Sequence, residues 1–241
     1  MPHQRHDMHS SKWIYLVLAL TGFTQISWAQ TIEQEPIEID KVSKSIYLKT
    51  NPLSVLQGPV PYFTGELRLG FEFIGSDRFT YQASASYVFL SPLLNVLANN
   101  TPAAFGGAIQ MPGYRFQGQV RYYYLKFYNK KKLSKVFLPT GLYTAIHSSY
   151  SNAYFRDKNA PIERIEFTQL SFDLLGGMQV MYNDVFGIDF FAGMGYKNNV
   201  ITYYDYRGRK EIWDADMVNL GSYYSSPIKL TIGMNLTFGL L

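Results

Sequence analysis

Residues 61–74 read PYFTGELRLGFEFI, and apolar and polar side chains alternate along the stretch. In an extended strand, successive side chains point to opposite faces. One face would carry Phe63, Leu67, Leu69, Phe71 and Phe73, and the other Thr64, Glu66, Arg68, Gly70 and Glu72. The stretch therefore predicts a β-strand with one apolar face and one charged face.

The same alternation recurs along the chain. It predicts eight strands, at residues 45–56, 61–74, 79–90, 114–127, 136–147, 166–181, 186–197 and 228–240. The fifth of these is ambiguous in its facing. Short turns at 75–78, 129–135 and 182–185 alternate with long loops at 91–113, 148–165 and 198–226, the first of them with a short helix expected at 93–98. Short periplasmic turns and long external loops are typical of outer-membrane barrels. We predict an all-β fold, an eight-stranded antiparallel up-and-down transmembrane β-barrel over residues 45–241.

The N-terminal 29 residues have the pattern of a signal peptide. Arg5 and Lys12 supply the positive charge, residues 14–26 are mainly apolar, and Ser27-Trp28-Ala29 fits a small-x-small cleavage site. Residues 30–44 are polar and acidic, and we expect a flexible periplasmic lead-in. The apolar run is too short to cross a bilayer as a helix, so an integral protein with this sequence must be a barrel. The predicted location is the outer membrane of a Gram-negative bacterium.

Composition excludes several classes of function. The chain has no cysteine, which removes disulfides, thiolate metal sites and catalytic thiols. A net charge of +4 is too small and dispersed for a nucleic-acid surface. No metal-ligand spacing, phosphate loop or dinucleotide fingerprint occurs, so we expect no metal and no cofactor. The 20 tyrosines and 17 phenylalanines suit the aromatic girdles of a membrane barrel.

If the apolar faces meet lipid, the polar faces line the lumen. The charged residues expected there are Glu66, Arg68, Glu72, Arg115, Arg121, Asp173, Asp189, Lys197 and Lys229. Side chains just fill an eight-stranded barrel, and an unpaired ion inside would be costly. We therefore predict a plug of salt bridges, with the glycines at 70, 193, 195 and 233 making room for the long cationic side chains. Two alternatives stay open: an ion-conducting lumen, and a soluble periplasmic lipid-binding barrel with its apolar faces inside.

The segment KTNPLSVLQGPVPYFTGELRLGFEF at 49–73, with the alternation over 45–241, resembles small eight-stranded outer-membrane barrels of OmpA- or OmpX-like architecture. It is also similar to outer membrane protein β-barrel sequences without assigned activity. The resemblance implies a structural or surface-interaction protein without catalysis. Expected partners are outer-membrane lipids or lipopolysaccharide, the barrel-assembly machinery, and an extracellular ligand bound through loops 91–113, 148–165 and 198–226.

One motif suggests chemistry. His147 and Ser149, followed by Asn152, resemble the His-x-Ser and Asn of membrane lipid A deacylases, although there the Asn directly follows the Ser. His147 and Ser149 would share a strand face, so a base could lie near its nucleophile. Glu163 or Glu166 could orient the histidine from the next strand. The alternative function is an outer-membrane lipid A acyl hydrolase.

Overall fold

The computed structural model describes residues 46–56, 58–60, 63–76, 78–92, 94, 96, 109–127, 139–157, 160–182, 185–213, 224 and 226–240. The predicted signal peptide at 1–29 and lead-in at 30–44 lie outside these residues. The predicted turn at 129–135 lies outside them too, as does most of the predicted helix at 93–98.

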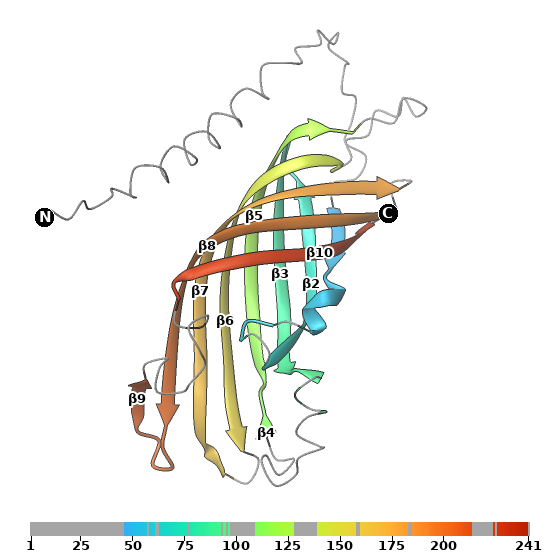
Figure 1. Ribbon diagram of the computed structural model, residues 1–241. Helices are drawn as coiled ribbons and strands as arrows, with labels where there is room; N and C mark the ends of the chain where they lie inside the picture. The colour runs from blue at the N-terminus through green and yellow to red at the C-terminus, as the bar shows by residue number, and fades with distance from the viewer. Residues whose placement is uncertain are drawn as a thin grey trace, which may run out of the picture. The chain divides into compact units, whose positions relative to one another are not determined.

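Eight antiparallel strands form a closed barrel (Figure 1). They are β1 (Ile46–Thr50), β2 (Thr64–Ile74), β3 (Phe79–Leu90), β5 (Gly113–Lys126), β6 (Gly141–Asp157), β7 (Ala160–Tyr182), β8 (Phe186–Tyr204) and β10 (Ile228–Gly239). Pairing of β10 with both β8 and β1 closes the circuit. Two short strands, β4 (Ile109–Gln110) and β9 (Lys210–Trp213), pair with β6 and β8. The predicted all-β fold, with eight antiparallel strands in a closed barrel, is confirmed.

The predicted loop at 148–165 is largely strand, and the one at 198–226 is strand in part. Residues 148–157 continue β6 and residues 160–165 begin β7. The two strands pair in this region, with one register shift between Arg156 and Asp157. Likewise, β8 continues through residues 198–204 and pairs with β9. Serine and asparagine made residues 148–152 look like a loop, but their backbone still completes the ladder. The barrel therefore has an extended end, where β6 passes into β7, and a short-turn end, where β7 passes into β8.

The first strand is shorter than predicted. It ends at Thr50 and is followed by a 3-10 helix, η2 (Pro52–Val55). Asn51 caps this helix, because its side-chain oxygen accepts a hydrogen bond from the Ser54 backbone N–H at 3.1 Å. Pro52 cannot donate to a ladder, which favours a strand end here.

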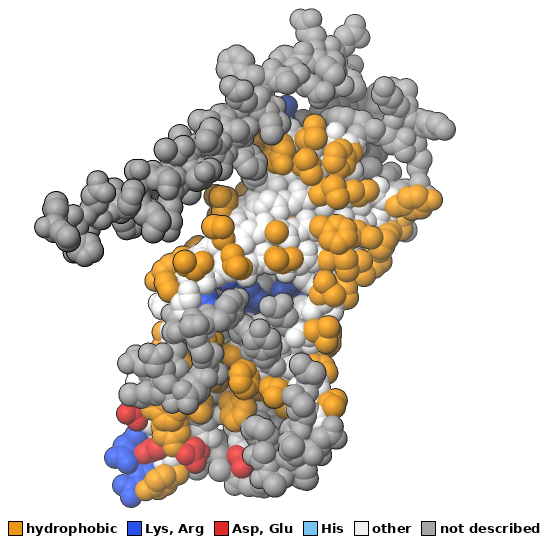
Figure 2. All heavy atoms as spheres, viewed as in Figure 1, with side chains coloured by type: hydrophobic (Ala, Val, Ile, Leu, Met, Phe, Trp, Pro, Cys, Tyr) orange, Lys and Arg blue, Asp and Glu red, His pale blue; other side chains and the backbone are white. Residues whose placement is uncertain are grey.

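The apolar faces point outward. Leu174 is 65% exposed, Ile232 is 83% exposed, and Phe71 and Phe190 are also exposed. Figure 2 shows hydrophobic side chains, in orange, along the wall of the barrel. In β6, whose facing was ambiguous, Ile146 points out and alternate residues from Tyr143 to Ser151 are buried inside. No helix in the described part of the chain is long and apolar enough to cross a membrane.

The described residues of the interior form two apolar clusters. At the extended end, buried Val60, Val88, Met111, Ala153, Phe167, Ile201 and Tyr224 pack together. Toward the short-turn end, Tyr123, Tyr143, Ala145 and Leu175 form a smaller cluster with the partly buried Phe191. The charged and amide side chains of the lumen lie in two further groups, described below.

Candidate functional site

The first charged group joins Lys49 and Arg121 to Glu72 and Asp189. It lies toward the short-turn end of the barrel, and we call it the lower network. Lys49 Nζ lies 2.8 Å from Glu72 and 3.0 Å from Asp189. Arg121 lies 2.8 Å from Asp189 and 3.6 Å from Glu72. Each cation therefore contacts both carboxylates, and none of the four side chains is more than 2% exposed. The group is neutral, with two charges of each sign supplied by β1, β2, β5 and β8.

Neutral side chains complete the lower network. Gln179 Oε1 accepts hydrogen bonds from Lys49 at 2.7 Å and Arg121 at 2.8 Å. The Tyr143 hydroxyl donates to Asp189 at 2.6 Å, and the Arg121 guanidinium lies 4.4 Å from the centre of the Tyr143 ring. Asn235 donates to Asp189 Oδ2 at 2.9 Å. Buried ions are tolerated when hydrogen bonds satisfy their remaining atoms, which is the case for this Asp189 carboxylate.

The second group, the upper network, surrounds two other carboxylates. Glu66 contacts Arg68 directly and Arg115 at 3.4 Å. Asp173 lies 2.7 Å from both Lys229 Nζ and His147 Nδ1. Each of these two carboxylates is thus shared between two basic side chains.

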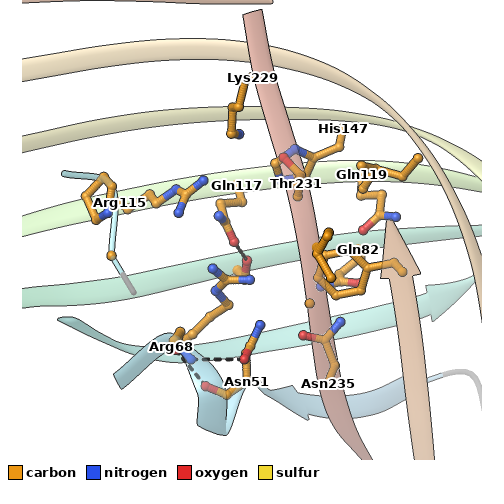
Figure 3. A pocket seen from close by; sticks show the side chains of 18 of the residues that line it. Asn51, Arg68, Gln82, Arg115, Gln117, Gln119, His147, Lys229, Thr231 and Asn235 are labelled. Atoms are coloured by element: carbon orange, nitrogen blue, oxygen red, sulfur yellow. Dashed lines mark hydrogen bonds between the residues drawn. The ribbon is translucent and has the colours of Figure 1, made fainter. Parts of the chain in front are cut away.

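A cavity of about 120 Å³ lies beside the upper network. Arg68, Arg115, His147, Lys197 and Lys229 line it, and Figure 3 shows all of these but Lys197 labelled around it. Among the described residues that line it, none is Asp or Glu. The lining of the cavity therefore carries basic and amide groups. The carboxylates that pair with the basic groups are not part of the lining.

The nine charged residues predicted for the lumen all lie inside the barrel wall. Eight are buried and Arg68 is nearly so, and the structure divides them between the two networks, with Lys197 near the cavity. Sequence reasoning missed Lys49 and the contact of His147 with Asp173. Lys49 shares the inner face of β1 with buried Tyr47, a signal obscured by the irregularity at Pro52.

At the four glycines predicted to make room for long cationic side chains, the nearest neighbours are other groups. A Cβ at residue 233 would meet the Phe191 ring, and one at 70 would meet Ser84. At residues 193 and 195, the nearest atoms belong to β7, including its backbone carbonyls. The space at these glycines is therefore taken by neighbouring strands and an aromatic ring, and the nearest atoms are not those of Arg or Lys.

The residues of the alternative hydrolase are only partly brought together. His147 and Ser149 share the inner face of β6, but the Ser149 hydroxyl is hydrogen-bonded to Ser171 at 2.8 Å and to Arg115 at 3.2 Å. Neither glutamate lies beside His147. Glu163 accepts from the Tyr203 hydroxyl and Glu166 from Asn152, both toward the extended end. In the described part of the chain, no cluster of three His, Cys, Asp or Glu could hold a metal ion.

Comparisons with known proteins add little. No family model matches the chain, and no curated protein matches it. Among solved structures, a major outer membrane protein from Thermus thermophilus matches at 12% sequence identity and a TM-score of 0.38. The match covers 81% of this chain and 98% of that chain. A likeness at this level says nothing further about this chain.

Proposed function

We propose that this protein is an integral outer-membrane β-barrel of structural or surface-interaction type, closed to ion flow and without catalytic activity. The observation that carries the proposal is the arrangement of its two faces. Exposed apolar side chains cover the outside of the barrel, and paired charges fill the inside. This is the distribution that a membrane barrel needs, because lipid meets its outer wall.

The soluble lipid-binding alternative fits poorly. Such a barrel would hold Phe71, Leu174 and Phe190 in a central cavity and turn its charges to water. Instead these three side chains point outward, while Glu72 and Asp189 are fully buried.

Closure of the lumen is supported by its filling. The apolar cluster at the extended end and the lower network toward the short-turn end lie on either side of the cavity. In the lower network, each cation contacts two carboxylates. The charges of these four side chains balance one another, so they offer no unpaired charge to attract a permeating ion. An eight-stranded barrel has room for little more than its own side chains. Conduction would require breaking several buried ion pairs.

The contacts of His147 and Ser149 favour a role in packing over catalysis. Catalysis by this pair would need the Ser149 hydroxyl hydrogen-bonded to His147. His147 Nδ1 bonds Asp173, which a catalytic histidine could also do, but the Ser149 hydroxyl bonds Ser171 and Arg115 and not His147.

The extended end supports an external contact surface. In the proposed orientation, the signal peptide exports the chain, the barrel-assembly machinery inserts it, and the extended end faces outside. Tyr203 and Trp213 stack there at 4.5 Å, and the Arg164 guanidinium lies 4.5 Å from the centre of the Tyr204 ring. Such aromatic and cationic groups suit contact with lipopolysaccharide or an extracellular ligand.

The proposal is tested by fractionation and conductance. The full chain, expressed in a Gram-negative host, should stay with outer membranes after a carbonate wash and should migrate differently on gels before and after heating. In planar bilayers it should give no open-channel steps above the protein-free background. Release by carbonate would refute the membrane placement, and reproducible steps would refute the closed lumen.

A further inference from the structure

The barrel wall is incomplete on one side of β10. Residues 228–238 pair with β8, but on the other side only residues 236–239 pair with β1. Because β1 ends at Thr50, the described chain offers no strand partner to residues 228–235 of β10 on that side. Along residues 228–235, the side of β10 that faces β1 is therefore a strand edge without a hydrogen-bonded neighbour strand among the described residues.

The 3-10 helix η2 stands where β1 would have continued. Its Ser54 hydroxyl donates to the Glu66 carbonyl at 2.8 Å, and the Thr50 hydroxyl donates to the Arg68 carbonyl at 2.9 Å. These two hydroxyl groups thus hydrogen-bond backbone carbonyls on the edge of β2. No comparable bond from the described residues of η2 to β10 occurs. The cavity reaches the junction of η2 and β10, because Leu53, Ser54, Leu230 and Ile232 all line it, and we call this junction the opening.

This opening connects the basic cavity to the outer surface. Leu230 and Ile232 line the cavity, yet their side chains are 61% and 83% exposed among the outward apolar residues. Figure 2 shows Lys and Arg side chains, in blue, in the wall directly beside β10. In a membrane, irregular backbone is tolerated only where it is buried in protein or lines a water-filled cavity, and here it lines the basic cavity.

The cavity has unused hydrogen-bond donors. Arg115 is 7% exposed and its Nε has no hydrogen-bond partner. The amide nitrogen Nε2 of Gln119, which is 8% exposed, has none either. The Thr231 hydroxyl, on the unpaired part of β10, also lacks a partner. All three residues line the cavity and lie around it in Figure 3. Buried donors without partners are costly, so this site is built to receive an acceptor.

We propose that the cavity binds the phosphate headgroup of an anionic membrane lipid, which enters sideways through the opening between η2 and β10. This inference rests on the proposed membrane placement of the barrel. Arg68, Arg115 and Lys229 share only Glu66 and Asp173, and Asp173 is also shared with His147. A phosphate would add charge-assisted hydrogen bonds to these cations. The cavity volume admits a phosphate group, and the exposed Leu230 and Ile232 leave the acyl chains in contact with apolar surface.

The test is native mass spectrometry of the purified barrel in a neutral detergent, with dioleoylphosphatidic acid as the probe and dioleoylphosphatidylcholine as the comparison. The barrel should bind one phosphatidic acid in preference to phosphatidylcholine. Arg115→Gln and Lys229→Gln should each weaken this binding about tenfold or more. Arg209→Gln removes an exposed cation paired with Asp205 and should leave it unchanged. Equal binding of the two lipids, or full binding by both cavity variants, would overturn the proposal.

A second measurement tests sideways entry and does not remove a buried charge. The chain has no cysteine, so Thr231→Cys introduces a single thiol at the opening. In phosphatidylcholine vesicles, decyl methanethiosulfonate, which partitions into lipid, should modify this thiol. Thr237→Cys, fully buried where β10 pairs with β1, should stay unmodified.

The source of the phosphate is distinguished by adding inorganic phosphate. Competition with phosphatidic acid, together with modification of the Thr231→Cys thiol, supports headgroup binding from the membrane. Phosphate binding without modification of that thiol would show entry from water and overturn the lipid proposal. A barrel that resists carbonate but binds no phosphatidic acid contradicts this inference alone, whereas release by carbonate contradicts the proposed function itself.

Discussion

Arg121 and Asp189 form an ion pair of 2.8 Å across the barrel, from strands that are not neighbours in the wall, and neither side chain is exposed. The strands β6 and β7 separate them along the sheet. The pair therefore ties opposite parts of the wall together, which the ladder hydrogen bonds cannot do. Lys49 and Glu72 extend the tie to β1 and β2.

Replacing Asp189 with asparagine should strongly destabilise the barrel. The substitution leaves the buried cations Lys49 and Arg121 with only Glu72 between them, and removing one partner of a buried ion pair typically costs about 3–5 kcal/mol. The measurement is urea unfolding of the barrel in phosphatidylcholine vesicles, followed by heat-modifiable migration. Asp205→Asn removes the charge that pairs with the exposed Arg209 and keeps an oxygen that can accept from the Arg207 and Arg209 backbone N–H groups, so it should leave the midpoint unchanged. Equal midpoints for wild type and Asp189→Asn would contradict the lower network as a stabilising element.

Two adjacent glycines offer a matched test of interior packing. A Cβ at Gly177 would lie 2.5 Å from the Tyr143 hydroxyl oxygen and 2.7 Å from the Phe190 carbonyl oxygen. Tyr143 cannot easily move aside, because its hydroxyl donates to Asp189. Gly177→Ala should therefore lower the free energy of unfolding by about 1–3 kcal/mol.

The neighbouring Gly176 is the control. A Cβ there meets nothing within 4 Å, so Gly176→Ala should leave stability unchanged or raise it slightly by restricting the unfolded chain. The same urea titration measures both variants. A Gly177→Ala barrel as stable as the Gly176→Ala barrel would mean that the Tyr143 ring is not held in place.

Strict alternation made some strands predictable to the residue. The bounds predicted for β3 agree with Phe79–Leu90, because Thr80, Gln82 and Ser84 alternate without a break with tyrosine and alanine. Prediction from alternation failed where side chains on both faces of a strand are buried. Ser151, Asn152 and Ala153 are consecutive in β6 and all buried, so no two-residue period marks that stretch as strand.

Which charged residues lie inside the barrel could be predicted from the sequence better than which of them pair with one another. Facing follows from alternation within one strand, which is local information. Pairing depends on how far the strands are staggered around the barrel, so the meeting of Arg121 with Asp189 could not be read from the sequence. The opening beside β10 was equally hidden, since it arises from the early end of β1 at Thr50.

Charge on the outer wall should reveal which part of the barrel lies in hydrocarbon. Leu174 is 65% exposed midway along β7, opposite Ile146 and Met194, and Ile212 is 69% exposed on β9, beyond the extended end of the closed barrel. Leu174→Arg should lower the free energy of unfolding in phosphatidylcholine vesicles by about 2–4 kcal/mol, because arginine near the midplane must leave water. Ile212→Arg should cost about 0–1 kcal/mol, since that residue would stand at or above the lipid surface. If the two variants fold with equal stability, β7 does not cross the bilayer at Leu174. The proposed membrane placement would then fail even though the barrel itself remained closed.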